Sequence, residues 1–268
     1  MTTTFGTGEL ILSALNHGAR QIVVGLGGSA THDGGCGMAQ ALGVRFHDVS
    51  GLPIRRPMTG GMLESITRID VSQINPRLRE TKITVACDVT NPLTGPNGAA
   101  YVYAPQKGAS PDQVEQLDAG LRHLAVLFRD QLGIDVEQRP GAGAAGGLGA
   151  GLMAFCGAEM HPGLDIVLEM VKFDKRVCGC DLCLTGEGRL DGQSLSGKAV
   201  IGVAQAAAKH NVPTVALVGS LGEGHEKSLG AGLKDYIEIG RGLSTEESMA
   251  RAADLLEQAT ALAISMHT

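Results

Sequence analysis

Short apolar runs alternate with helical patterns along most of this chain. The runs at residues 20–26, 82–88, 181–185, 213–219 and 235–239 are apolar nearly throughout. Strands without polar alternation are typical of a sheet covered on both faces. Helices between such strands supply the crossover connections that parallel strands need. The pattern therefore predicts an α/β fold with parallel sheets.

Capping signals mark two of the helices between these runs. Ser110 and Pro111 form a capped start for a long helix that stops at Gly133. Ser244 opens a capping box and predicts a last helix that runs to about Met266.

Charge and hydrophobicity exclude two classes of partner. The formal net charge of −6 is unsuited to nucleic acid, which proteins bind through clustered Lys and Arg. No apolar run approaches the ~20 residues that span a bilayer, and the chain does not open on a signal peptide. We therefore expect a cytoplasmic protein that binds neither nucleic acid nor membranes.

The six cysteines are expected to be reduced thiols. Cys178, Cys180 and Cys183 include a C-x-x-C spacing, which occurs in zinc sites and redox pairs. No second ligand pair follows, and Cys183 lies in an apolar run, as a small buried hydrophobe would. A structural metal site is therefore disfavoured at this cluster.

A glycine-rich segment follows the first apolar run, where open α/β sheets bind their ligands. Its residues Gly27, Gly28 and Ser29 expose backbone N–H groups that could hold an anion. Asp33 lies a few residues further on. Its carboxylate could lie beside a metal ion, act as a base, or cap the N-terminus of the next helix.

Two further segments leave both a functional and a structural interpretation open. Asp88 and Asn91 follow the second apolar run and could bind a metal or a substrate hydroxyl. Residues of these types near proline also form ordinary turns. Lys107 could supply a cation to a site or lie in an exposed turn.

The densest polar cluster follows the third apolar run, over residues 185–194. It places the carboxylates Glu187 and Asp191 and the cation Arg189 among three glycines. A solvated loop rarely contains three glycines around alternating charges directly after a buried strand. We therefore expect a functional site here.

Two segments resemble nucleotide-binding motifs, but neither satisfies its motif in full. Residues 192–198 read G-x-x-x-x-G-K, but Ala199 stands where a phosphate loop needs Ser or Thr. Residues 141–146 fit G-x-G-x-x-G, yet Pro140 precedes them in place of a convincing strand. The glycine-rich stretch 141–151 could be a linker, a ligand-facing loop or a tightly packed small-residue helix.

Together these segments resemble the bacterial glycerate kinase family. The matching stretches lie in the family's order: TTTFGTGEL, GLGGSATHDGGCGM, ACDVTNPLTGPNGAA, APQKGA, GAGAAGGLGAGL and TGEGRLDGQSLSGKA. The resemblance implies that the chain phosphorylates glycerate to phosphoglycerate, with ATP and Mg²⁺ as cofactors and an active site between two lobes.

The resemblance also implies how the lobes are arranged in sequence. Residues 1–178 would form an inserted α/β lobe, and residues 179–268 would form the C-terminal part of a split, flavodoxin-like lobe. Family members carry a further segment of roughly a hundred residues before the point where this chain begins. We therefore expect the N-terminal part of the split lobe to be absent and the activity to be impaired.

Phosphoryl transfer depends mostly on positioning the reactants and on neutralising their charge. The roles of the motif residues are assigned from that chemistry. The residues expected to hold the phosphates of the cofactor are Gly27, Gly28, Ser29 and Lys198. The residues expected to hold the substrate are Arg189, Asn91, Ser194 and Lys107. The expected catalytic carboxylates are Asp191, Glu187, Asp33 and Asp88. Of these, Glu187 and Asp191 are also expected to bind the metal.

Some questions stay open on the sequence. The alternative functions are a dinucleotide-binding oxidoreductase and a non-catalytic fragment that needs a partner. His32 and Cys36 stand at positions expected to vary in the family, so they are poor candidates for chemistry. The phosphorylated hydroxyl of glycerate and a homo-oligomeric state are both left open.

Overall fold

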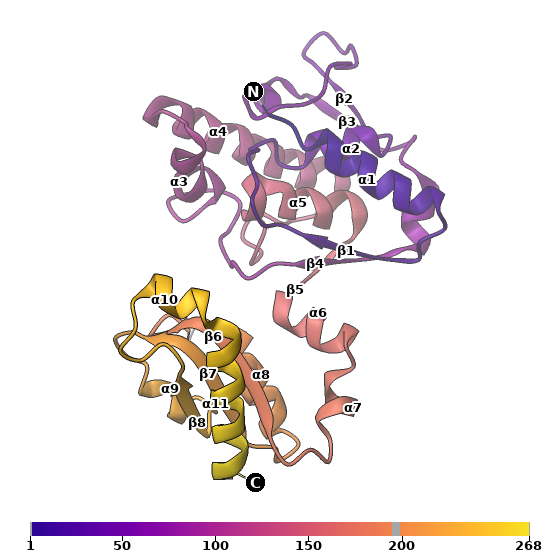
Figure 1. Cartoon of the computed structure of the whole chain (residues 1–268). Coiled ribbons are helices and arrows are strands. Elements are labelled where there is room, and N and C mark those ends of the chain that lie inside the picture. Colours follow the sequence, from indigo (N-terminus) through magenta and orange to yellow (C-terminus); the bar gives the residue numbers. More distant parts are fainter. Residues whose placement is uncertain (1, 195–198, 268) are drawn as a thin grey trace. The chain divides into compact units, whose positions relative to one another are not determined.

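The computed structural model describes residues 2–194 and 199–267 (Figure 1). The chain divides into two compact units, which are Met1–Gly163 and Leu164–Thr268. They are called unit 1 and unit 2 below. The inserted and split lobes, with their boundary after residue 178, stay a prediction.

Unit 1 contains two small sheets. The parallel sheet has the strand order β1-β4-β5, and the antiparallel sheet pairs β2 with β3. The strands are β1 (Gln21–Gly25), β2 (Arg45–His47), β3 (Arg68–Asp70), β4 (Lys82–Ala86) and β5 (Glu159–His161). β1 and β4 confirm the first two predicted strands. The others are three residues long and have no counterpart among the predicted strands.

The helices of unit 1 include the predicted long helix. The α-helices are α1 (Phe5–Asn16), α2 (Cys36–Ala41), α3 (Ala99–Tyr103), α4 (Pro111–Leu127) and α5 (Ala144–Cys156). Three short 3-10 helices are η1 (Gly60–Ser65), η2 (Pro76–Glu80) and η3 (Pro105–Lys107), and a π-helical turn, η4 (Phe128–Leu132), continues α4. The predicted capped start at Ser110 is present and is a full capping box with Gln113, and Gly133 ends the helix in the left-handed conformation.

One face of the parallel sheet in unit 1 carries helices and the other is open. α1, α2 and α5 lie on the same side of β1 and β4 (Figure 1). On the opposite face, Gln21, Val23 and Gly25 of β1 are exposed. Within unit 1 taken by itself, the predicted cover on the second face is therefore absent at β1, where Val23 remains 48% exposed.

Aromatic residues organise the core between the helices and the two sheets. The ring of Phe155 on α5 meets Phe46 of β2 and Phe128 of η4 edge to face, at centroid separations of 6.0 and 5.2 Å. Such pairs add about 0.5–1.5 kcal/mol each beyond the area that they bury. The core thus holds α5 in a fixed place.

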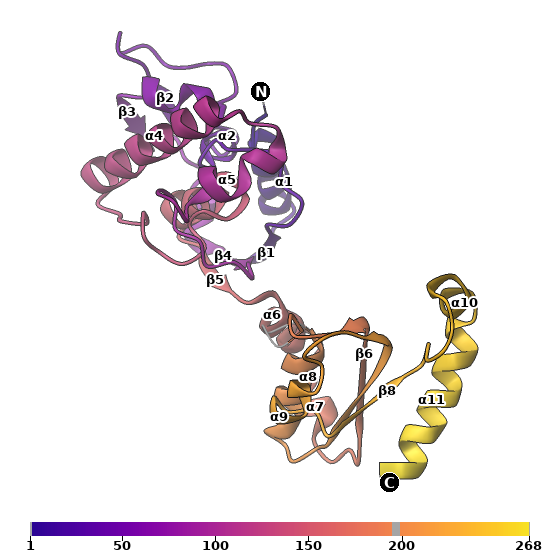
Figure 2. The ribbon, with the colours of Figure 1, turned by 90° about the vertical axis from the view of Figure 1, so that its left-hand side faces the viewer.

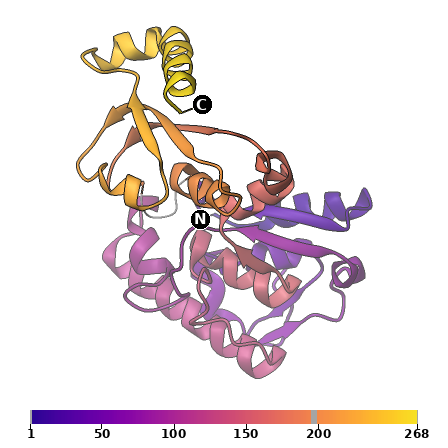
Figure 3. The same cartoon turned by 90° about the horizontal axis from the view of Figure 1, so that it is seen from below.

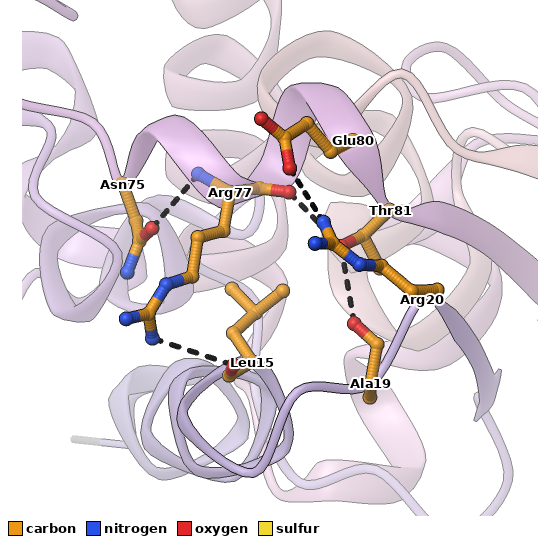
Figure 4. A network of polar contacts seen from close by, with 7 residues as sticks. All are labelled: Leu15, Ala19, Arg20, Asn75, Arg77, Glu80 and Thr81. Atoms are coloured by element: carbon orange, nitrogen blue, oxygen red, sulfur yellow. Dashed lines mark hydrogen bonds and ion pairs between the residues drawn. The ribbon is translucent and has the colours of Figure 1, made fainter.

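A polar network joins α1 to the region before β4 (Figure 4). The Arg77 guanidinium donates to the carbonyl of Leu15, and Thr81 donates to the carbonyls of Ala19 and Arg77. Arg20 and Glu80 form an exposed ion pair. These contacts help to fix the parallel register that pairs Gln21 with Lys82.

Unit 2 is a three-stranded parallel sheet with helices. The strand order is β6-β7-β8. The elements are α6 (Gly163–Met170), α7 (Phe173–Val177), β6 (Cys183–Leu190), α8 (Ala199–Ala208), β7 (Thr214–Leu221), α9 (Lys227–Gly230), β8 (Asp235–Glu238), α10 (Thr245–Ala250) and α11 (Ala252–His267). The prediction of an α/β fold with parallel sheets is confirmed.

Helices cover both faces of the unit 2 sheet, as its apolar strands predict. Ala216 and Val218 of β7 pack with Val200 and Ile201 of α8. On the other face, residues of β7 pack with α11 at Ala259 and Ala263. Figure 2 shows the strands between α8 and α11, and Figure 3 shows the same order from below.

Two predicted boundaries in unit 2 are wrong. The third strand is predicted to end at Thr185, but β6 continues to Leu190 and stays paired with β7, up to Leu190 opposite Leu221. The last helix breaks near Arg251 into α10 and α11, although the capping box at Ser244 is present. Of the described helices, none combines the length and the apolar character that crossing a membrane requires.

Candidate functional site

A pocket of about 550 Å³ in unit 1 collects several of the predicted site residues. The loop after β1 contributes Gly27, Gly28 and Ser29, and the loop after β4 contributes Asp88. Lys107, at the end of η3, lines the pocket as well. Because β1 and β4 are neighbouring parallel strands, their carboxyl ends bring these two loops to the same edge of the sheet.

Lys107 is held in place by two oxygen atoms. Its Nζ donates to Ser29 Oγ at 2.8 Å and to the carbonyl oxygen of Thr31 at 2.9 Å. Desolvation by burial lowers the pKa of Lys107, and the charge of Asp33 opposes that shift. The structure thus places a partly desolvated cation against the glycine loop, where it can neutralise a phosphate.

Asp88 and Asn91 are each held by a hydrogen bond. Asp88 Oδ1 accepts from the backbone N–H of Gly163 at 2.8 Å, and the Asp88 residue is exposed. Asn91 Oδ1 accepts from the Tyr103 hydroxyl at 2.6 Å, and its amide donates to the carbonyl of Asn97. Tyr103 and Asp88 line the pocket, whereas Asn91 is not among the lining residues and contacts the site through Tyr103.

Asp33 lies away from the pocket, fully buried beneath the loop. Its carboxylate accepts hydrogen bonds from the backbone and hydroxyl of Thr4, from the hydroxyl of Thr3, and from the N–H groups of Gly35 and Gly37. Desolvation raises the pKa of Asp33, while the bonds from Thr4, Gly35 and Gly37 act in the opposite direction. This pattern ties the start of α1 to the start of α2.

The glycine-rich stretch at 141–151 lines the pocket through Ala144 and Ala145. Ala145, Gly146 and Gly147 are consecutive residues with positive φ, and α5 continues beyond them. A Cβ on Gly146 would meet the Thr31 carbonyl and the ring of His32. Of the three interpretations offered, the linker is wrong. The stretch is both a pocket wall and a tightly packed helix.

Unit 2 places the residues of the 185–194 segment on and just beyond β6. Glu187 and Arg189 belong to the strand itself, and Asp191 follows it. The Arg189 Nε and Asp191 Oδ2 atoms are 3.6 Å apart. Asp191 Oδ1 accepts from the N–H of Gln193, and the buried Ser194 Oγ accepts from the N–H of Asp191. These contacts form a tight turn at the carboxyl end of β6.

Glu187 has unmet hydrogen-bonding capacity. Its Oε1 atom is buried and has no hydrogen-bond partner. The side chain lines a pocket of about 660 Å³ that also involves the glycines Gly186, Gly188 and Gly219. Within residues 2–194 and 199–267, no group of three or more His, Cys, Asp or Glu residues could hold a metal ion. Lys198 lies outside the described residues.

Comparison with known proteins identifies the family. The model of the glycerate kinase family matches residues 1–268. The chain is 48% identical over 259 residues to glycerate kinase of Halalkalibacterium halodurans, which covers 96% of this chain and 68% of that protein. It is 50% identical over 221 residues to glycerate 2-kinase of Escherichia coli, which covers 82% of this chain and 58% of that protein.

The chain belongs to the glycerate kinase family. The crystal structure of a Salmonella typhimurium LT2 protein assigned as glycerate kinase 2 matches it with a TM-score of 0.85 at 42% identity. That match covers 100% of this chain and 71% of the Salmonella chain. The chain thus spans about three fifths to seven tenths of the length of these relatives. None of them supports an oxidoreductase or a non-catalytic fragment.

Among the residues that line the unit 1 pocket without having been predicted, three have polar side chains. Tyr103, Cys87 and Gln106 line it together with the predicted residues. Cys87 and Gln106 lie in stretches that match the glycerate kinase family, so that match could have flagged them. Tyr103 comes just after such a stretch, and no local pattern distinguishes its hydroxyl from that of an ordinary helix residue.

Proposed function

We propose that this chain transfers the terminal phosphate of ATP to glycerate, the substrate that its relatives' names give. A kinase family implies ATP as the phosphate donor. The observation that carries the proposal is the Lys107 ammonium, which donates to Ser29 Oγ and to the Thr31 carbonyl beside the glycine loop. A cation and exposed backbone N–H groups are the two features that stabilise phosphoryl oxygens during transfer.

The residues of each unit have separate parts in this proposal. In unit 1, Gly27, Gly28 and Ser29 bind phosphate, and Asp88 and Asn91 bind a hydroxyl group. Asp33 supports the loop from below, since its carboxylate is already occupied by hydrogen bonds.

In unit 2, Arg189 pairs with the carboxylate of glycerate, Ser194 holds the turn, and Asp191 accepts the proton of the attacking hydroxyl. The hydroxyl oxygen forms a bond to the γ-phosphorus as the bond from that phosphorus to the ADP oxygen breaks. Lys198 is proposed to bind phosphate on the motif alone.

Mg²⁺ fits the Glu187 carboxylate of unit 2, whose Oε1 has no hydrogen-bond partner. Mg²⁺ in kinases is bound through one or two carboxylates plus the phosphates of the substrate, so three protein ligands are not required. Asp191 lies four residues further on, past the end of the extended strand β6, and does not line the pocket of Glu187. We therefore assign Glu187 alone to this ion. When bound, it would neutralise charge on the phosphates.

Phosphorus NMR of the purified chain with ATP, Mg²⁺ and D-glycerate tests this function. We expect a phosphoglycerate signal that requires glycerate. Its splitting by protons identifies the modified hydroxyl, because a 2-phosphate gives a doublet and a 3-phosphate gives a triplet. Reduction of NAD by glycerate, without phosphoglycerate, would contradict the proposal. The cytoplasmic location and the oligomeric state stay predictions from the sequence.

A further inference from the structure

The loop that follows β7, residues 222–225, packs against the turn after β6 that carries Asp191. It is called the β7 loop below. The N–H of Gly222 donates to the carbonyl of Leu190 at 2.7 Å. In the opposite direction, the N–H of Gly192 donates to the carbonyl of Glu223 at 2.9 Å. The two bonds continue the contact between β6 and β7 past the ends of both strands, and they fix the backbone on either side of Asp191.

Gly222 leaves room for two side chains of the candidate site. Its φ lies outside the positive range that favours glycine, so the backbone conformation does not require this residue type. A Cβ at Gly222, however, would lie 2.6 Å from Asp191 Cβ and 2.8 Å from Arg189 Nε. Non-bonded heavy atoms prefer separations of about 3.5–4.0 Å. Any larger residue at position 222 would therefore displace the Arg189 side chain and shift the turn.

His225 braces the β7 loop from within. The carbonyl oxygen of Gly222 can only accept, so His225 Nδ1 is the donor of the 2.8 Å bond between them. The imidazole ring meets Tyr236 of β8 edge to face, at a centroid separation of 5.3 Å. The carbonyl of His225 accepts from the hydroxyl of Ser228 in α9 at 2.6 Å, and Ser228 is fully buried. The loop is thus anchored to β8 and to α9.

We propose that the β7 loop positions the substrate-binding side chains of unit 2, because its contacts set the direction of Arg189 and the place of Asp191. The roles of these two side chains toward glycerate rest on the proposed function. The Arg189 side chain is 65% exposed, so it is free to turn into solvent unless the loop limits it. A support that orders a long side chain in advance reduces the entropy lost on binding. Gly222 and His225 are therefore positioning residues and need not touch the substrate.

Arginine side-chain NMR of the full chain tests this support without relying on turnover. The Nε–Hε signal of Arg189 is recorded in Gly222→Ala and in Gly230→Ala, the matched control. Gly230 ends α9, its φ is not positive, and a Cβ there would meet no atom within 4 Å. We expect the Arg189 signal to move toward that of a free arginine in Gly222→Ala and to stay in place in Gly230→Ala. An unmoved signal in Gly222→Ala would overturn the proposal.

A pair of substitutions at His225 tests the brace without adding bulk at Gly222. His225→Phe keeps an aromatic ring against Tyr236 and loses the donor to the Gly222 carbonyl. His225→Asn offers a side-chain N–H in place of Nδ1 and should restore that bond. We expect the KM for D-glycerate to rise roughly tenfold in His225→Phe, with the KM for ATP unchanged, and to return in His225→Asn. A rise that His225→Asn does not reverse would contradict the role given to this bond.

The outcomes separate the positioning loop from the proposed function. In an Arg189→Gln background, Gly222→Ala should raise the KM for D-glycerate little further, because its effect passes through the guanidinium. Full additivity of the two substitutions would overturn the proposal. An Arg189 signal that moves in Gly222→Ala while the KM for D-glycerate stays the same would confirm the support. It would also contradict the role that the proposed function gives to Arg189.

Discussion

Asp33 and Lys107 are charged residues of unit 1 with opposite kinds of surroundings. Asp33 is buried and its oxygens accept bonds from the residues that open α1 and α2. Lys107 lines two pockets and keeps a donor available. Asp33 therefore contributes mainly to stability, and Lys107 mainly to binding.

Replacement of Asp33 should affect stability far more than turnover. Asp33→Asn turns an NH₂ group toward N–H and O–H donors, so we expect the free energy of unfolding to fall by roughly 2–4 kcal/mol. Urea denaturation measures this loss. Asp48→Asn is the control and should cost about 0.5 kcal/mol, because the amide oxygen of Asn can still accept from the N–H groups of Ser50 and Leu52. A stable Asp33→Asn protein without activity would instead make Asp33 catalytic.

Acid should destabilise unit 1 through His32. The pKa of this buried ring is lowered to about 4 from 6.5, so between these values the unfolded chain binds a proton that the folded chain does not. The free energy of unfolding should then fall as the pH drops from 6.5 to 4, by up to about 3 kcal/mol. His32→Gln should flatten this dependence in urea denaturation, whereas His17→Gln, at an exposed position, should leave it unchanged. If the free energy of unfolding depended on pH equally in both variants, the acid sensitivity would not come from His32.

Strand β6 marks where local sequence and tertiary pairing disagree. Glycine and charged residues are depleted in strands, so the sequence after Thr185 predicts a loop. The structure extends the strand because Gly186, Glu187 and Arg189 pair in parallel with the buried central strand β7. Helix caps depend on neighbouring residues alone, and the capped start at Ser110 and the capping box at Ser244 were both predicted correctly.

The start of α5 depends on glycine for close packing, which a pair of substitutions can test. Gly146 has φ +68°, and a Cβ there would meet the backbone of Thr31 and His32. Gly157 has a similar φ of +62°, but a Cβ there would have no neighbouring atom within 4 Å. Gly157→Ala should cost about 1–2 kcal/mol from backbone strain alone. Gly146→Ala should cost clearly more in thermal or urea denaturation. If both variants lost the same free energy of unfolding, the close contacts around Gly146 would not contribute to stability.

At the scale of the whole molecule, each unit carries candidate site residues of its own. Unit 1 supplies Lys107 and the glycine loop, and unit 2 supplies Glu187 and Asp191. The sequence predicted the glycine loop, Glu187 and Asp191 because they follow apolar runs, whereas Lys107 follows no such run and could equally have been an exposed turn residue. It did not predict that Lys107 lines two pockets, since that depends on how η3 meets the loop after β1.

The turnover number for D-glycerate with ATP and Mg²⁺, compared across variants of both units, tests the central claim most directly. Lys107→Met removes the cation of unit 1, and Asp191→Asn removes a carboxylate of unit 2. Lys82→Met, in an exposed ion pair with Glu159, is the control for loss of a lysine. We expect the first two variants to fold and to lose roughly 10²-fold or more in kcat, and the control to match the original chain. Turnover at the original rate in Lys107→Met or in Asp191→Asn would contradict the account.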